Sequence, residues 1–212
     1  MLPIGDKPII HYIIQELSDA GITDILILIG RGRECLVNYF DYHSELDLPL
    51  PFPNINITFK RVPKPLGAAN CVYHSKDFVG GEDFLVAYSD NVFFGANPTK
   101  ELLSSGANSV CVVEVPQKET HKYGIWDGTS IIEKPQNATS NLAGFGRYLL
   151  SPIIFDLIEQ DMGGDGEVCM TQQLNKLAAT GQLKAVKTCA MGFDIGNKVG
   201  WHQANLYALG TT

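Results

Sequence analysis

Apolar residues recur with two different periods along the chain. Residues 8–20 carry Ile9, Ile10, Ile13, Ile14 and Leu17 at helical spacing, between a proline suited to a first helical turn and a glycine suited to a stop. Residues 24–29 (DILILI) are almost entirely apolar, which is typical of a strand covered on both faces. The two patterns predict a helix followed by a buried strand.

The same patterns predict the remaining elements. Further helices are expected at 34–40, 66–78, 151–158, 171–179 and 198–209. Further strands are expected at 55–61, 84–88, 109–115, 142–149 and 183–188, with a hairpin of 123–126 and 130–133. Residues 42–54 are expected to form a loop, and 163–166 a flexible one. Strands that alternate with helices indicate one α/β domain over residues 1–212 with a mainly parallel central sheet.

Composition narrows the class of protein. The 212 residues hold 16 Lys and Arg against 23 Asp and Glu, a formal charge of −7, and no basic cluster, which argues against a nucleic-acid partner. No apolar run approaches the roughly 20 residues of a membrane helix, and no secretory leader pattern opens the chain. We therefore expect a cytoplasmic protein without a membrane partner.

The cysteines indicate neither a disulfide framework nor a zinc site. They are odd in number, scattered and without a C-x-x-C pair. We expect reduced and mostly buried thiols. The five are Cys35, Cys71, Cys111, Cys169 and Cys189.

Two aspartates are candidate ligands of a hard cation. Asp90 directly follows a predicted buried strand, and ligands of open α/β sheets bind beyond the carboxyl ends of strands. Asp194 lies between glycines before a predicted helix. Carboxylates suit Mg²⁺, which takes oxygen ligands. The alternatives are a turn-forming aspartate and an ordinary helix cap, and periodicity cannot show whether the two side chains meet.

Glu133 and Lys134 form a second candidate site at the end of a predicted strand. A lysine can hold a phosphate as a point charge, and a glutamate can accept hydrogen bonds from sugar hydroxyls. Gly67, at the start of a predicted helix, could let a flat ring approach the backbone. A solvated ion pair and a glycine that only eases a loop into a helix are the alternatives.

In this order, these residues resemble the sugar-nucleotide pyrophosphorylases, and among them the bacterial UTP–glucose-1-phosphate uridylyltransferases. The resemblance extends from Met1 to Asn205. The matching stretches are MLPIGDKPIIHYIIQEL, PLGAANCV, YGIW, IIEKP, SNLAGFGRYLL, GEVCMTQQL and FDIGNKVGWHQAN.

The resemblance implies a nucleotidyltransferase-type α/β sandwich with a mixed sheet, commonly a homo-oligomer. Its reaction joins a nucleoside triphosphate, here UTP or dTTP, to a sugar 1-phosphate, giving a nucleotide-sugar (UDP-glucose in the uridylyltransferases) and pyrophosphate by in-line attack. By the same resemblance, Asp90 and Asp194 would hold Mg²⁺ and Lys134 would grip the sugar phosphate.

The resemblance also implies a sugar site and a base site. Glu133 and the backbone of Gly124 would contact the sugar, as would Asn91, because an Asp-Asn pair is more similar to the thymidylyltransferases at this point. The base would lie against Leu66 and Gly67. Val62 stands where a base-reading glutamine is expected, and valine cannot hydrogen-bond a uracil.

The family's glycine-rich loop, G-x-G-T-R, and the strand before it are not among residues 1–212. That strand is central in the family's sheet, so its neighbours would be left with unpaired backbone groups. Three hypotheses follow: a working nucleotidyltransferase whose loop lies outside these residues or comes from another chain, a relative that binds a sugar phosphate or nucleotide-sugar without turnover or partners an active subunit, and a purely structural domain.

Overall fold

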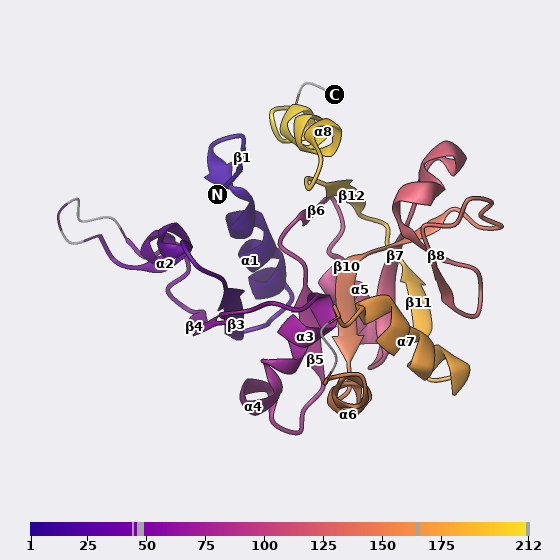
Figure 1. The fold of residues 1–212 in the computed structure, drawn as a ribbon. Helices are drawn as coiled ribbons and strands as arrows, with labels where there is room; N and C mark the ends of the chain where they lie inside the picture. Colours follow the sequence, from indigo (N-terminus) through magenta and orange to yellow (C-terminus); the bar gives the residue numbers. More distant parts are fainter. Residues whose placement is uncertain (44, 46–48, 164–165, 211–212) are drawn as a thin grey trace.

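The computed structural model describes residues 1–43, 45, 49–163 and 166–210, and its elements alternate between helix and strand (Figure 1). The α-helices are α1 (Ile9–Asp19), α2 (Glu34–Phe40), α3 (Ala68–Tyr73), α4 (Lys76–Val79), α5 (Pro98–Ser105), α6 (Ile153–Gln160), α7 (Met170–Ala179) and α8 (Lys198–Ala208), with a 3₁₀ helix at Gln117–Lys122. The strands are β1 (Pro3–Ile4), β2 (Lys7–Pro8), β3 (Asp24–Ile29), β4 (Asn56–Arg61), β5 (Phe84–Ala87), β6 (Asn91–Phe94), β7 (Ser109–Glu114), β8 (Gly124–Trp126), β9 (Ile131–Glu133), β10 (Leu142–Leu150), β11 (Lys184–Lys187) and β12 (Met191–Asp194).

The central sheet is mixed, as expected for an α/β fold. It runs β11-β7-β10-β8-β9, and β5 also pairs with β10. The expected excess of parallel pairs is wrong for the described strands, because β10 runs antiparallel to β5, β7 and β8. Parallel pairing joins β7 to β11 and β3 to β4. Strands β6 and β12 form a separate antiparallel pair.

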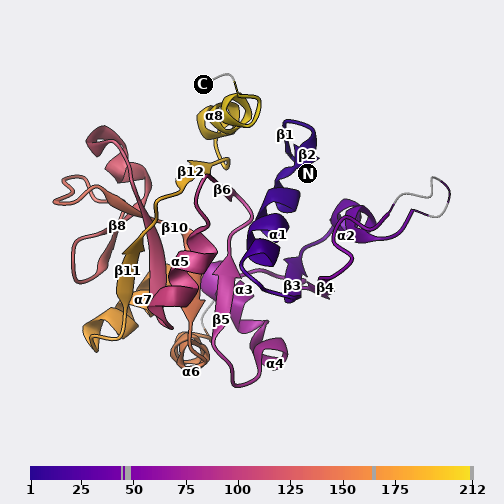
Figure 2. The same ribbon diagram turned by 180° about the vertical axis from the view of Figure 1, so that it is seen from behind.

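Helices cover both faces of this sheet. Along β7, Val110 and Val112 pack against α3, α6 and α7, whereas Cys111 and Val113 belong to a second cluster with α5. This alternation follows from the two-residue period of a strand. Helix α7 is drawn in front of the sheet in Figure 1, and α5 in front of it in the reverse view of Figure 2. The apolar run at 110–113 is therefore that of a strand buried on both faces.

Most predicted elements form within one or two residues of their expected bounds, but the helix expected at 66–78 is divided into α3 and α4. The Ser75 hydroxyl donates to the Val72 carbonyl, a local bond that competes with continued helix. Elements β6, α5 and β12 were not predicted. The loop expectations at 42–54 and 163–166 fall partly on residues 44, 46–48 and 164–165, which lie outside the described residues.

The cysteines are free thiols, but the expectation that most are buried is wrong. Only Cys111 is buried, whereas Cys35 and Cys189 are exposed and the other two are half-buried. Within the described ranges, no helix has the length and apolar character needed to cross a bilayer.

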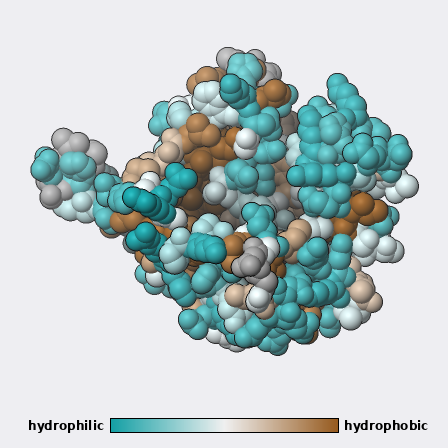
Figure 3. Space-filling view, in the orientation of Figure 1, coloured by the Kyte–Doolittle hydropathy of each residue, from teal (hydrophilic) through white to brown (hydrophobic). Residues whose placement is uncertain are grey.

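A groove of about 910 Å³ separates β3 from β5. Helix α1 contributes apolar side chains to its wall, and so do α3 and α4. Among the described strands, β3 pairs only with β4 and β5 only with β10, so each leaves one backbone edge open. A hollow with apolar residues on its wall also opens in the middle of the face drawn in Figure 3, beside the position of α1 in Figure 1.

Candidate active site

Tertiary pairing brings Asp90 and Asp194 together from distant parts of the sequence. Asp90 lies between β5 and β6, and Asp194 is the last residue of β12. The antiparallel pair of β6 and β12 places Asp194 opposite Asn91. The Ile195 amide then donates to the Asp90 carbonyl at 2.8 Å. The two segments are thus fixed side by side through their backbones.

The two carboxylates face the same small space beside Gly196. A methyl group added at Gly196 would lie 3.1 Å from Asp194 Oδ1 and 3.4 Å from Asp90 Oδ2. The Gly196 amide donates to Asp194 Oδ1 at 2.9 Å, and the Asn197 side-chain amide donates to Asp194 Oδ2 at 3.1 Å. These donors orient the Asp194 carboxylate. Asp90 is classed as an exposed residue, so part of its surface contacts solvent.

The surroundings raise the pKa of Asp90. Desolvation by the surrounding protein is the largest cause, and the negative charge of Asp194 adds to it; a backbone hydrogen bond and the Arg147 guanidinium act in the opposite direction. A pair of neighbouring carboxylates suits a divalent cation, which keeps waters and phosphate oxygens as its other ligands. In the described part of the chain, no cluster of three acidic, histidine or cysteine side chains offers a more complete site.

The raised pKa predicts how Asp90→Asn changes stability. A group whose folded pKa is raised contributes stability that is full below the unfolded pKa and is lost as pH rises through the folded pKa. At neutral pH and without metal, Asp90→Asn is therefore expected to raise the melting temperature, and the gain should shrink as the buffer is made more acidic. Scanning calorimetry in a series of buffers from neutral to acidic pH measures this.

Asp127 supplies a control of opposite sign. Hydrogen bonds from Ser130 and Thr129 lower the pKa of Asp127, so its charged form contributes stability that is lost as pH falls. Asp127→Asn should lower the melting temperature at neutral pH. A melting temperature that falls at neutral pH for Asp90→Asn, as for Asp127→Asn, would contradict a raised pKa of Asp90.

Glu133 and Lys134 lie in a constrained backbone segment at the end of β9. Lys134 has a φ of 46°, in the left-handed region that residues other than glycine rarely adopt, and its amide donates to the Tyr123 carbonyl at 3.0 Å. Its ammonium lies 4.0 Å from Glu133 Oε1, and Glu133 Oε2 accepts a bond from the Thr171 hydroxyl at 3.0 Å. Such strain is concentrated at functional sites.

A tyrosine pair is formed by Tyr88, two residues before Asp90 in the chain, and Tyr148 of β10. The rings of Tyr88 and Tyr148 pack edge to face with centroids 5.3 Å apart. Burial raises the pKa of Tyr148 to about 12, and the charges of Glu133 and Asp90 both add to this increase. The charges of Asp90 and Glu133 therefore both act on the Tyr148 hydroxyl.

The residues expected at the base site have strong structural roles. Val62 is buried, and its amide donates to the Ile29 carbonyl at 2.9 Å. Gly67 has a φ of 88°, and a side chain there would lie 2.6 Å from the Val168 carbonyl oxygen. The Leu66 carbonyl accepts a bond from the Val168 amide at 2.8 Å. These contacts fix the segment before α3, and its role in base binding stays a prediction.

Asn91 is buried as well, at 8% exposure. Its side chain packs against Gly146, whose φ of 52° and missing side chain leave the space that the Asn91 amide fills. This packing fixes the start of β6. Contact between Asn91 and a sugar stays a prediction.

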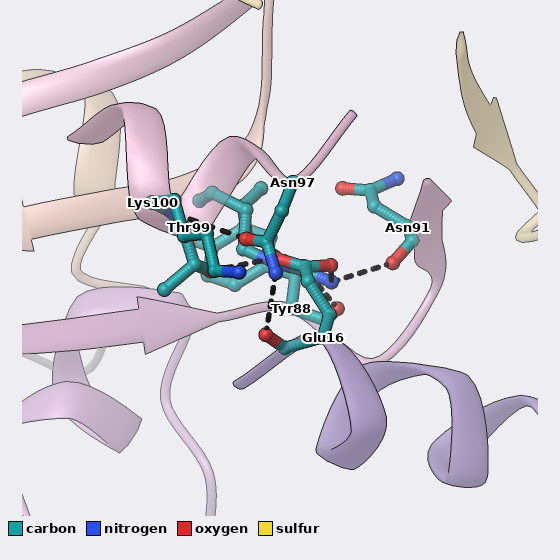
Figure 4. Close-up of polar contacts among 8 residues, drawn as sticks. Glu16, Tyr88, Asn91, Asn97, Thr99 and Lys100 are labelled. Carbon is teal, nitrogen blue, oxygen red and sulfur yellow. Dashed lines mark hydrogen bonds and ion pairs between the residues drawn. The ribbon is translucent and has the colours of Figure 1, made fainter. Parts of the chain in front are cut away.

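A buried polar network lies behind Asp90, and no pattern in the sequence predicted it. Arg147, from β10, is fully buried and forms two hydrogen bonds with the Glu16 carboxylate of α1, each 3.0 Å long. Glu16 also accepts a bond from the Thr99 hydroxyl at 2.6 Å, and its carbonyl accepts one from Asn97 (Figure 4). The sequence feature that could have indicated this network is Arg147, a charged residue within the mostly apolar segment 142–150.

The fold is that of a nucleotidyltransferase. Residues 1–209 match the family described as Nucleotidyl transferase, and the chain belongs to that family of enzymes. The predicted resemblance and the α/β sandwich are thereby confirmed.

The chain is similar to UTP–glucose-1-phosphate uridylyltransferases in particular. It is 32% identical to the enzyme of that name from Staphylococcus epidermidis, over 99% of this chain and 84% of the relative. It superimposes with a TM-score of 0.88 on a UDP-glucose pyrophosphorylase complexed with UDP-glucose, at 26% identity over 100% of this chain and 90% of the other. A UTP-bound UGPase from Acinetobacter baumannii gives a TM-score of 0.84 at 26% identity, over 98% of this chain and 84% of the other. These relatives support nucleotidyl transfer that forms a sugar nucleotide.

Proposed function

We propose that this chain transfers a uridylyl group from UTP to glucose 1-phosphate, with Mg²⁺ held between Asp90 and Asp194. The observation that carries the proposal is the convergence of these two carboxylates beside Gly196. The names of the relatives supply the substrates, UTP and glucose 1-phosphate. Because Val62 stands at the expected base-reading position and is buried, dTTP is the alternative nucleotide to be compared.

In the proposed reaction, an oxygen of the sugar phosphate attacks the α-phosphorus of the triphosphate. The new O–P bond forms as the bond to the β-phosphate oxygen breaks, and pyrophosphate leaves with the electron pair. When bound, Mg²⁺ supplies neutralisation of phosphate charge. Lys134 holds the sugar phosphate as a point charge, and its strained backbone fixes where the side chain starts. Asp90 and Asp194 supply the charge and the oxygen atoms of the metal site.

The sugar site is proposed to combine Glu133 with the backbone of Gly124. Strands β8 and β9 place these two residues opposite each other in antiparallel register. The Thr171 hydroxyl orients the Glu133 carboxylate through Oε2, and Oε1, which lies 4.0 Å from the Lys134 ammonium, is proposed to accept from a sugar hydroxyl. The arrangement positions the substrate and requires no covalent step by the protein.

Gly124→Ala is expected to raise the KM for glucose 1-phosphate about tenfold. The new methyl group would lie 2.9 Å from Ile131 Cγ2 and 3.2 Å from Glu133 Oε2, so the carboxylate must move. A small displacement of a positioning group costs substantial rate or binding. Gly81→Ala is the matched control, because nothing lies within 4 Å of the added methyl group. Equal KM values for the two variants would remove Glu133 from the sugar site.

A direct assay tests the proposed function. The purified chain is incubated with Mg²⁺, glucose 1-phosphate and either UTP or dTTP, and pyrophosphate and nucleotide-sugar are quantified. Omission of Mg²⁺ and omission of the sugar phosphate serve as controls. The expected result is a nucleotide-sugar formed in equal amount to pyrophosphate. Absence of product with both nucleotides would refute the proposal for this polypeptide.

Binding of a nucleotide-sugar without turnover is the second candidate function. One observation favours it: Val62, which stands at the expected base-reading position, is buried and has no side-chain group that could hydrogen-bond a base. Calorimetry with UDP-glucose, run beside the turnover assay, separates the two functions. Tight binding without product supports this candidate, and no binding eliminates both.

The proposal includes a homo-oligomeric state. Open strand edges favour pairing between chains, and β3 and β5 each leave such an edge. Sedimentation velocity over a range of protein concentrations measures the state, and a monomer throughout would exclude this part of the proposal.

A further inference from the structure

We propose that Arg147 is a positioning residue that fixes the segment carrying Asp90 and thereby sets the separation of the two carboxylates. This inference rests on the proposed function, in which Asp90 holds the metal. Arg147 does not touch the reacting atoms, and its effect reaches the site through the main chain of residues 88–91.

An irregularity in β10 places Arg147 beneath the site. Gly144 pairs with Val112 and Tyr148 with Val110, so β10 contains more residues than β7 over this stretch. Gly146, within the irregular stretch, has a positive φ of 52°. Such bulges bend a strand and re-aim a side chain, and here the re-aimed side chain is fully buried.

The Arg147 guanidinium binds both ends of the segment that holds Asp90. Nη1 donates to the Tyr88 carbonyl at 3.1 Å, and Nη2 donates to the Asn91 carbonyl at 3.1 Å. Ser89 and Asp90 are the two residues between these anchors. Nη1 also donates to the Gly146 carbonyl at 3.1 Å, which ties the segment to β10.

Glu16 holds the guanidinium in this position. Its two carboxylate oxygens accept from Nε and Nη2 of Arg147, a bidentate geometry that fixes the plane of the guanidinium. Helix α1 in turn is tied to the start of α5, because Asn97 donates to the Glu16 carbonyl and Thr99 to its carboxylate (Figure 4). The hydrogen bonds that hold the Asp90 segment thus connect it to β10, α1 and the start of α5.

This buried support has a clear role in a site made of two like charges. Asp90 and Asp194 carry like charges, and their carboxylates border the same small space beside Gly196. Only a fixed main chain keeps the oxygen atoms at the spacing that a cation needs. Loss of a group that supports a metal ligand typically lowers metal affinity about 10- to 100-fold.

The test compares Arg147→Lys with Thr99→Val in the full chain. Lysine keeps the charge but lacks the planar fork, so it cannot bind Glu16 and both carbonyls together. Thr99→Val removes one bond to Glu16 and leaves the bonds of Arg147 to Tyr88 and Asn91 intact. Mn²⁺ alone is the probe; free Mn²⁺ is measured by electron paramagnetic resonance, and kcat and KM are measured for wild type and both variants.

For Arg147→Lys we expect an Mn²⁺ Kd about tenfold or more above that of wild type, with a lower kcat and little change in the KM for glucose 1-phosphate. Thr99→Val should have a lower melting temperature than wild type but the same Kd for Mn²⁺. A folded Arg147→Lys protein with the wild-type Kd overturns the proposal, and so does a wild-type chain that binds no Mn²⁺. If Arg147→Lys does not fold, the double variant Arg147→Met/Glu16→Leu, which removes both buried charges, is judged by the same Kd.

The two failures are distinguishable. A wild-type chain that binds Mn²⁺ but forms no nucleotide-sugar refutes the proposed function, while the change in Kd still decides the role of Arg147. A wild-type enzyme with turnover and an unchanged Kd in the folded variant refutes the positioning role alone.

Discussion

Asp90→Asn and Asp194→Asn are each expected to lower kcat about 10²- to 10³-fold. Either change removes a carboxylate from the space beside Gly196, where phosphate charge is to be neutralised. Loss of one preorganised group that stabilises developing charge typically costs a factor of this size. Steady-state rates of pyrophosphate release, measured over a series of Mg²⁺ concentrations, give both kcat and the apparent metal affinity.

Asp77→Asn is the matched control for these two variants. The Asp77 side chain is 93% exposed and contacts only Lys60 among the ion pairs of the described residues, at 3.7 Å. Its rate should equal that of wild type. If Asp90→Asn were as active as Asp77→Asn, the metal site would have to be placed elsewhere.

Glu16→Ala is expected to lower the free energy of unfolding by about 3–5 kcal/mol. The change leaves the Arg147 guanidinium buried without its carboxylate, and breaking a buried pair on one side costs about that much. For a chain of this length, that corresponds to a fall of roughly 10 °C in melting temperature. Urea denaturation followed by circular dichroism measures the free energy directly.

Two comparisons show whether burial is the cause of this loss. Glu159→Gln breaks an ion pair with Lys76 that is 3.2 Å long but exposed, so it should lower the free energy of unfolding far less than Glu16→Ala does. The double variant Glu16→Leu/Arg147→Met removes both buried charges and should recover much of the stability lost in Glu16→Ala. A loss of similar size in Glu159→Gln and Glu16→Ala would contradict the stated cause.

Local periodicity was sufficient for most individual elements. The run at 24–29 forms β3 with the expected bounds, and Asp127 closes the expected hairpin by accepting from the amides of Thr129 and Ser130. The helix expected at 66–78 failed because the bond from Ser75 to Val72 is a detail of side-chain geometry. Strand β6 was missed because Asn91 resembles a loop residue until β12 pairs with it.

The sequence by itself determined the α/β class, most helices and strands, and the short segments that carry Asp90, Asp194, Glu133 and Lys134. These follow from periodicity and from the position of polar residues at strand ends, both of which are local properties. Only the tertiary structure decided that β6 and β12 bring Asp90 and Asp194 together and that Arg147 lies beneath them. The physical reason is that register between distant strands depends on packing of the whole chain, which no local pattern encodes.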